Sequence, residues 1–202
     1  MVPTLAAFEP FTSFDADIFG SRALAETLAA RAGWECRILP KRDSASVAIL
    51  LKSNAVGEPP LVIEVLDEVN GLTETDLALS TVVELEGGQR YRLPSPLVLF
   101  KAKLYNLISL ANLDRPQDLR HTRMLMALIP HYLNDLLSAV RRAEVPEREL
   151  LGAVRYLRDV IRQPWAGNAL RSHGLDHRAL FSEELRRRSP LMVRAAIEDI
   201  AP

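Results

Sequence analysis

A change of hydrophobic period near Pro94 constrains the fold of this chain more than any other feature. Before Pro94, short apolar or β-branched runs such as 46–51 and 61–69 alternate with turn residues, which is typical of strands. After Pro94, apolar residues recur at the spacing of helices with one buried face. This segregation predicts an α+β fold, with a sheet region over 1–93 and a helical region over 94–202 packed on it.

The same patterns predict individual elements. A helix is expected over 21–32, where Gly33 ends it, and the expected strands are 34–39, 46–51 and 61–69. Gly87 and Gly88 separate two further strand-like runs and indicate a hairpin. The helices expected after Pro94 are 96–113, 115–142, 146–162, 176–188 and 191–200.

Composition excludes several classes of function. With 202 residues, 48% of them hydrophobic, the chain can bury a substantial core as one large domain or two small ones. Its formal net charge is -1, so the chain as a whole has no positive electrostatic potential that would attract DNA, RNA or an acidic membrane. Cys36 is the single cysteine, which excludes an intramolecular disulfide and suits a reducing cytosol. No apolar run has the roughly 18 residues of a membrane span, and no signal-peptide pattern is present, so we expect a cytoplasmic protein without a membrane partner.

Two carboxylates, Asp15 and Asp17, stand at alternate positions of an apolar segment. In a strand, residues two apart share one face and lie roughly 7 Å apart. Like charges this close repel, so the pair requires a bound cation, a basic neighbour or full exposure to water. A pair of bound divalent metal ions would compensate this repulsion. The alternative is an acidic loop in which Asp17 helps to cap the helix that starts near Ser21.

Glu64 stands in the middle of the apolar run 61–66, where a buried carboxylate is costly unless it is paired or coordinated. If this strand lies beside the one that bears Asp15 and Asp17, three carboxylates meet at one edge of the sheet. They would suffice to hold two Mg²⁺ ions, with water and phosphate oxygens as the remaining ligands. The alternative is that Glu64 points into solvent from a half-exposed strand.

Lys101, Lys103 and Asp118 form a third cluster. Both lysines lie on the helix expected over 96–113, and Lys103 flanks its apolar face, where it could bind a triphosphate as a compact point charge. Asp118 opens the next helix, where its carboxylate could cap the helix end or orient Lys103. The alternative is a set of solvated charges with an ordinary helix cap.

Four segments of the chain, taken in order, resemble the minimal nucleotidyltransferase superfamily. They are Asp15-Ala-Asp17, the acidic strand with Glu64, the segment Pro94-Ser-Pro-Leu-Val-Leu-Phe-Lys101-Ala-Lys103-Leu and the segment Arg115-Pro-Gln-Asp118-Leu-Arg120. The similarity covers roughly residues 10 to 140 and is closest to the branch of AbiEii-type toxin nucleotidyltransferases. The resemblance implies a nucleotidyltransferase-like mixed β-sheet with flanking helices. It also implies two Mg²⁺ ions, a nucleoside triphosphate, and transfer of a nucleotidyl group to a hydroxyl of RNA or protein.

The resemblance also implies roles for individual residues. Asp15 and Asp17 would be the paired metal ligands, and Glu64 the third carboxylate and candidate base for the acceptor hydroxyl. Lys103, with Lys101 as the other candidate, would bind phosphate, and Asp118 would support it.

One part of the family pattern is missing. The family carries a Gly-Gly or Gly-Ser pair ahead of the first aspartate, on a helix whose backbone N–H groups cradle the phosphates, but here no glycine precedes Gly20. Either the true start lies upstream of Met1, or the phosphate cradle has been lost.

Three functions therefore stay open. The first is a Mg²⁺-dependent nucleotidyltransferase, and the second a non-catalytic protein of this fold that binds a nucleotide or a partner protein. The third is an interaction module without a nucleotide. The expected partners are a nucleotide and an RNA or protein acceptor, with an antitoxin or a second copy of the chain as further candidates; the sequence carries no strong DNA-binding signal.

Overall fold

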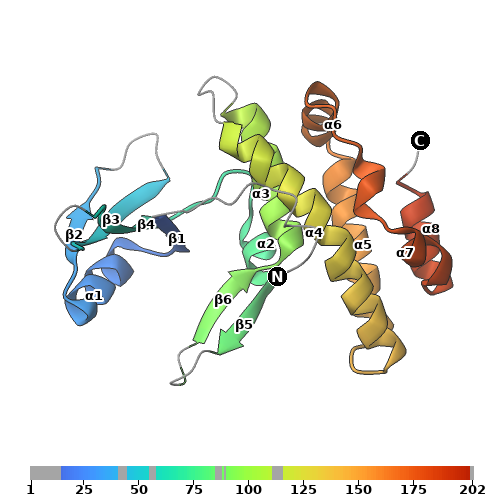
Figure 1. Cartoon of the computed structure of the whole chain (residues 1–202), viewed down its shortest axis with the longest axis horizontal. Helices are drawn as coiled ribbons and strands as arrows, with labels where there is room; N and C mark the ends of the chain where they lie inside the picture. The colour runs from blue at the N-terminus through green and yellow to red at the C-terminus, as the bar shows by residue number, and fades with distance from the viewer. Residues whose placement is uncertain are drawn as a thin grey trace. The chain divides into compact units, whose positions relative to one another are not determined.

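The chain folds into two compact units, which divide between Asn70 and Gly71. The computed structural model describes residues 15–40, 45–54, 58–84, 88, 90–110 and 116–200. The first unit is a small sheet with one helix, and the second is a hairpin with a group of helices (Figure 1). The protein is therefore a mixed α+β chain with its strands concentrated in the first half, as the sequence predicts.

The strand unit contains α1 (Arg22–Ala32) and the strands β1 (Asp15–Phe19), β2 (Glu35–Ile38), β3 (Ser46–Lys52) and β4 (Leu61–Leu66). The strand order in the sheet is β1-β4-β3-β2. β1 pairs with β4 in parallel, whereas β4 with β3 and β3 with β2 are antiparallel, so the sheet is mixed. A long connection through α1, β2 and β3 makes the parallel pair possible.

Helix α1 covers one face of this sheet. Ser21, and not Asp17, is its N-cap: the Ser21 side chain accepts a hydrogen bond from the backbone N–H of Leu24. The helix ends at Gly33, whose φ of 68° lies in the left-handed region that glycine adopts readily. The core between α1 and the sheet consists of Ala25, Ala29, Val47, Ala48, Leu50 and Val65.

The helical unit begins with α2 (Glu74–Ala78) and a hairpin of β5 (Ser80–Glu84) and β6 (Arg90–Pro94). It continues with α3 (Pro96–Ser109), α4 (Pro116–Arg141), α5 (Glu147–Ile161), α6 (Pro164–Ser172), the 3₁₀ helix η3 (His177–Leu180), α7 (Glu183–Arg188) and α8 (Leu191–Glu198). The backbone N–H of Ser95 donates to the carbonyl of Leu79, which ties the base of the hairpin to α2 and α3. The boundary that the sequence places near Pro94 thus lies inside this unit, between β6 and α3.

Helices α3, α4 and α5 supply the centre of the core of the helical unit. Phe100 and Leu104 on α3, Ile129 and Leu133 on α4, and Leu157 on α5 are completely buried, which provides the main driving force for packing. Helix α4 runs through Pro130 as one helix. No helix in the described part of the chain is both long and apolar enough to cross a membrane.

Candidate functional site

The register of β1 and β4 places the predicted acidic residues on one face of the sheet. Asp17 lies opposite Glu64, and Asp15 lies opposite Val62. Alternate residues of a strand share a face, and Val65, the neighbour of Glu64, packs in the core under α1. Asp15, Asp17 and Glu64 therefore belong to the face away from α1, which we call the carboxylate face. Because neighbouring strands lie about 4.8 Å apart, the backbones at Asp17 and Glu64 are close together.

The described carboxylates of this face differ in their surroundings. Asp17 is exposed and Glu64 is half-buried. The hydroxyl of Ser46, a buried residue at the start of β3, donates a hydrogen bond to Oε1 of Glu64. This contact restricts the rotamers of Glu64 and fixes one of its oxygens.

Carboxylates are the ligand type that Mg²⁺ prefers, so the donor set of the carboxylate face suits this ion. The backbone of Asp15 is described, but its side chain lies outside the described residues. Among the side chains that are described, no group of three or more His, Cys, Asp or Glu is placed to hold a metal ion. The described part of the proposed ligand set is therefore the pair Asp17 and Glu64, with Asp15 assigned to the same face by its backbone register alone.

In the helical unit, Lys103 of α3 contacts Asp118 in the first turn of α4. The Nζ of Lys103 lies 3.4 Å from Oδ1 of Asp118, and the side-chain amide of Asn106 donates to the same oxygen at 3.4 Å. The side chain of Asp118 is only 2% exposed, whereas that of Lys103 is 28% exposed. This ion pair joins the start of α4 to α3, and the Lys103 side chain remains partly accessible to solvent.

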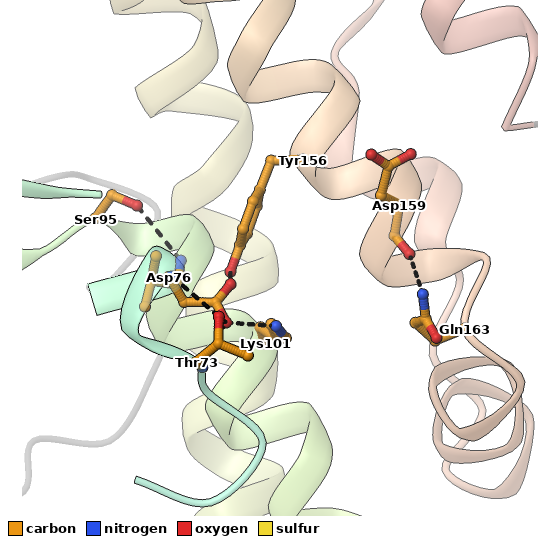
Figure 2. A network of polar contacts seen from close by, with 8 residues as sticks. Thr73, Asp76, Ser95, Lys101, Tyr156, Asp159 and Gln163 are labelled. Atoms are coloured by element: carbon orange, nitrogen blue, oxygen red, sulfur yellow. Dashed lines mark hydrogen bonds and ion pairs between the residues drawn. The ribbon is translucent and has the colours of Figure 1, made fainter. Parts of the chain in front are cut away.

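Lys101 contacts a different acid. Since it stands two residues before Lys103, it projects roughly 200° away around α3. Its Nζ lies 2.6 Å from Oδ2 of Asp76, a buried residue on α2. Asp76 also accepts hydrogen bonds from the hydroxyl of Tyr156 on α5, at 2.7 Å, and from the backbone N–H and the hydroxyl of Thr73, each at 2.7 Å (Figure 2). We call these residues, Thr73, Asp76, Lys101 and Tyr156, the Asp76 network.

The protonation states in the Asp76 network are fixed near neutral pH. Burial alone would raise the pKa of Asp76, but the hydrogen bonds from Lys101, Tyr156 and Thr73 outweigh it and lower the pKa from 3.8 to about 2. Burial raises the pKa of Tyr156 above its usual range, and the hydrogen bond to Asp76 and the charge of that carboxylate add to the effect. Asp76 is therefore ionised and Tyr156 protonated, so the network connects α2, α3 and α5 rather than transferring protons.

A pocket of about 330 Å³ adjoins the Asp76 network, and Lys101 and Tyr156 contribute to its lining. Tyr105 and Trp165 form another part of the lining, where their rings meet edge to face at 5.2 Å between centroids. Gly71 lies against Tyr105: it has a φ of 77°, and a Cβ built there would lie 2.5 Å from the Tyr105 ring. Only glycine fits this position without moving the aromatic ring.

Sequence reasoning missed Asp76 and Tyr156. One signal for Asp76 was present, because Thr73-Glu-Thr-Asp76 is a capping-box pattern, and the structure forms that capping box at the start of α2. No comparable signal links Tyr156 to Asp76, since the two residues are 80 positions apart.

Comparison with known proteins gives no match: no family model matches the chain, no curated protein matches it, and no solved structure matches its fold. Its function is therefore inferred from the arrangement of its own residues.

Proposed function

We propose that this chain is a nucleotidyltransferase-like protein that transfers a nucleotidyl group from a nucleoside triphosphate to a hydroxyl of RNA or protein, with Mg²⁺ as cofactor. One observation carries the proposal: the parallel register of β1 and β4 sets Asp17 opposite Glu64, with Asp15 two residues earlier on the same face. Carboxylates that face the same way on neighbouring strands can bind one divalent cation between them, and Mg²⁺ is the ion that such oxygen ligands suit.

In this proposal Asp15, Asp17 and Glu64 hold Mg²⁺ at the carboxylate face. Bound Mg²⁺ would neutralise negative charge on the phosphates of the donor nucleotide. The hydrogen bond from Ser46 to Glu64 would orient this ligand, as supporting hydrogen bonds do in metal sites generally. Glu64 is also the candidate base for the acceptor hydroxyl, and phosphate binding by Lys103 stays a separate prediction.

The metal-binding part can be tested by calorimetric titration of the protein with each nucleoside triphosphate, with and without Mg²⁺. We expect Mg²⁺-dependent binding in the wild type and a loss of at least tenfold in affinity in Asp17→Asn and in Glu64→Gln, because each substitution removes one charged ligand. The matched control is Glu35→Gln. Glu35 lies opposite Leu51, which lies opposite Val62, so it shares the carboxylate face but stands two strands from β4, roughly 10 Å away.

Glu35 already pairs with Arg37, and its substitution should leave nucleotide affinity unchanged. Unchanged affinity in Asp17→Asn and Glu64→Gln would reject the metal site, and so would an equal loss in Glu35→Gln. Transfer of label from an α-labelled triphosphate to RNA or protein then tests catalysis itself.

A second candidate function is a non-catalytic protein of the same fold that binds a nucleotide or a partner protein. The hydrogen bond from Ser46 to Oε1 favours it, because only Oε2 of Glu64 is then left, and one oxygen cannot both bind the metal ion and take the proton of the acceptor hydroxyl. Mg²⁺-dependent binding of a triphosphate without any label transfer, at saturating nucleotide and with RNA and protein acceptors supplied, would support this function over the first.

A further inference from the structure

A second pocket, of about 590 Å³, lies in the helical unit where α5, α6 and the end of α8 contribute side chains. Its apolar lining comes from Ile161, Leu170, Leu175 and Ile200. Three of these side chains are buried, and Leu175 is half-buried. No residue of the Asp76 network or of the predicted nucleotide site lines this pocket, so it is a separate site.

The lining contains two arginines, Arg162 and Arg171, and one carboxylate, that of Asp199. Arg162 donates hydrogen bonds to the backbone carbonyl and to Oδ1 of Asp199, both at 2.7 Å. Arg171 donates to the neutral amide oxygen of Asn168 at 2.6 Å, and within the described part of the chain it forms no ion pair with a carboxylate. The lining therefore carries the charge of one arginine in excess.

Gly167 allows the guanidinium of Arg171 to stay at the pocket wall. Both residues lie on α6 and line the pocket, one helical turn apart. A Cβ built at Gly167 would lie 3.2 Å from Nη1 of Arg171, which is a tight contact. With no side chain at position 167, the guanidinium folds back along the helix over Gly167.

We propose that this pocket binds a small amphiphilic carboxylate, with its apolar body on the lining and its carboxylate on Arg171. Apolar groups gain from burial against Ile161, Leu170 and Ile200. A guanidinium donates two parallel hydrogen bonds to a carboxylate, and the excess positive charge discriminates against a neutral molecule of the same shape. This inference goes beyond the proposed nucleotidyl transfer and does not depend on it.

The test is calorimetric titration of the full chain with octanoate, octanamide and acetate. Octanoate and octanamide differ only in the charged head group, and acetate has the head group without the apolar chain. We expect octanoate to bind, octanamide to bind at least tenfold more weakly, and acetate to show no measurable binding. Equal affinities for octanoate and octanamide, or no binding of octanoate, would overturn the proposal.

Two variants locate the binding in this pocket. Arg171→Gln should lower the affinity for octanoate about tenfold and leave that for octanamide unchanged, whereas Leu175→Trp should weaken both because it fills the apolar space. The control is Arg148→Gln, which removes an exposed arginine of α5 outside the pocket and should change neither affinity. Arg171 is exposed, so its variant should keep the wild-type melting temperature. Unchanged octanoate affinity in both pocket variants would assign the binding to another part of the molecule and overturn the proposal.

Discussion

Asp76 shows what a single buried carboxylate can do for this fold. Its side chain is 6% exposed and receives hydrogen bonds from a lysine, a tyrosine and the threonine that caps its own helix. An ionised group in such a position is tolerated because donors surround it, and removing one partner leaves the other charge buried and uncompensated. At the residue scale, the charge of Asp76 therefore matters to stability more than its size.

The lowered pKa of Asp76 predicts a pH dependence of stability. A carboxyl with a depressed pKa in the folded state contributes stability that is present above its unfolded pKa of 3.8 and is lost as the pH falls towards about 2. The loss should amount to about 2 kcal/mol for this group. We expect it in the free energy of unfolding of the helical unit, measured by urea denaturation between pH 5 and pH 2 with circular dichroism.

Asp76→Asn supplies the comparison. This variant should be less stable than the wild type by about 3 kcal/mol at neutral pH, because Lys101 loses its counter-charge. Its free energy of unfolding should also lack the decrease at acid pH that comes from protonation of Asp76. Asp135→Asn, an exposed position on α4, should stay within about 0.5 kcal/mol of the wild type. A pH profile identical in Asp76→Asn and the wild type would show that the ionised network does not stabilise the fold.

At the scale of the elements, the hydrophobic period predicted the long helices and the central strands well. Helices α1, α3, α4 and α5 lie within the predicted ranges, since an amphipathic stripe over several turns is a strong signal. Helices α2 and α6 were not predicted, and the single helix predicted over 176–188 is wrong, because the chain forms η3 and the separate helix α7 there. α2 has five residues, too few turns for a periodic pattern, and its capping box sets its start. α6 has nine residues and starts at Pro164 without a side-chain cap, so proline at the first position is its main local signal.

A substitution at Gly71 tests how closely the segment before α2 packs on α3. Gly71→Ala should lower the free energy of unfolding by about 2 kcal/mol or more, because it adds both a disfavoured φ and a clash with the ring of Tyr105. The matched control is Gly88→Ala, which has nearly the same φ, 76° against 77°, and no heavy atom of the described residues within 4 Å of the built Cβ. It should cost only about 1 kcal/mol, the backbone strain alone. Equal losses in the two variants, measured by urea denaturation, would show that the contact with Tyr105 is unimportant.

At the scale of the whole molecule, the sequence indicated the order of strands before helices but not how distant segments pair. The pairing of β1 with β4 in parallel joins residues almost 50 positions apart, and it decides that Asp17 faces the same way as Glu64. The alternation of strand residues made this shared face a reasonable prediction once the strands were assumed to be neighbours. The contact between Asp76 and Tyr156 could not be predicted in this way, because it depends on how three helices pack.

Each unit has a core of its own, which predicts that the helical unit folds independently. The larger core consists of residues between 97 and 200, and the smaller one of residues between 25 and 65. A fragment of residues 71–202 should therefore show helical circular dichroism and a cooperative thermal transition. A fragment of residues 95–202 lacks Asp76 and should melt at a lower temperature, and a fragment 71–202 without a cooperative transition would contradict the prediction.

The Asp76 network also affects how mutational surveys of this protein should be interpreted. In a selection for cellular activity, substitutions at position 76 would be depleted as strongly as those at a reacting group, because they reduce the amount of folded protein. Measuring abundance alongside activity would separate the two effects: variants at position 76 should lose both, whereas variants at position 17 should lose activity alone.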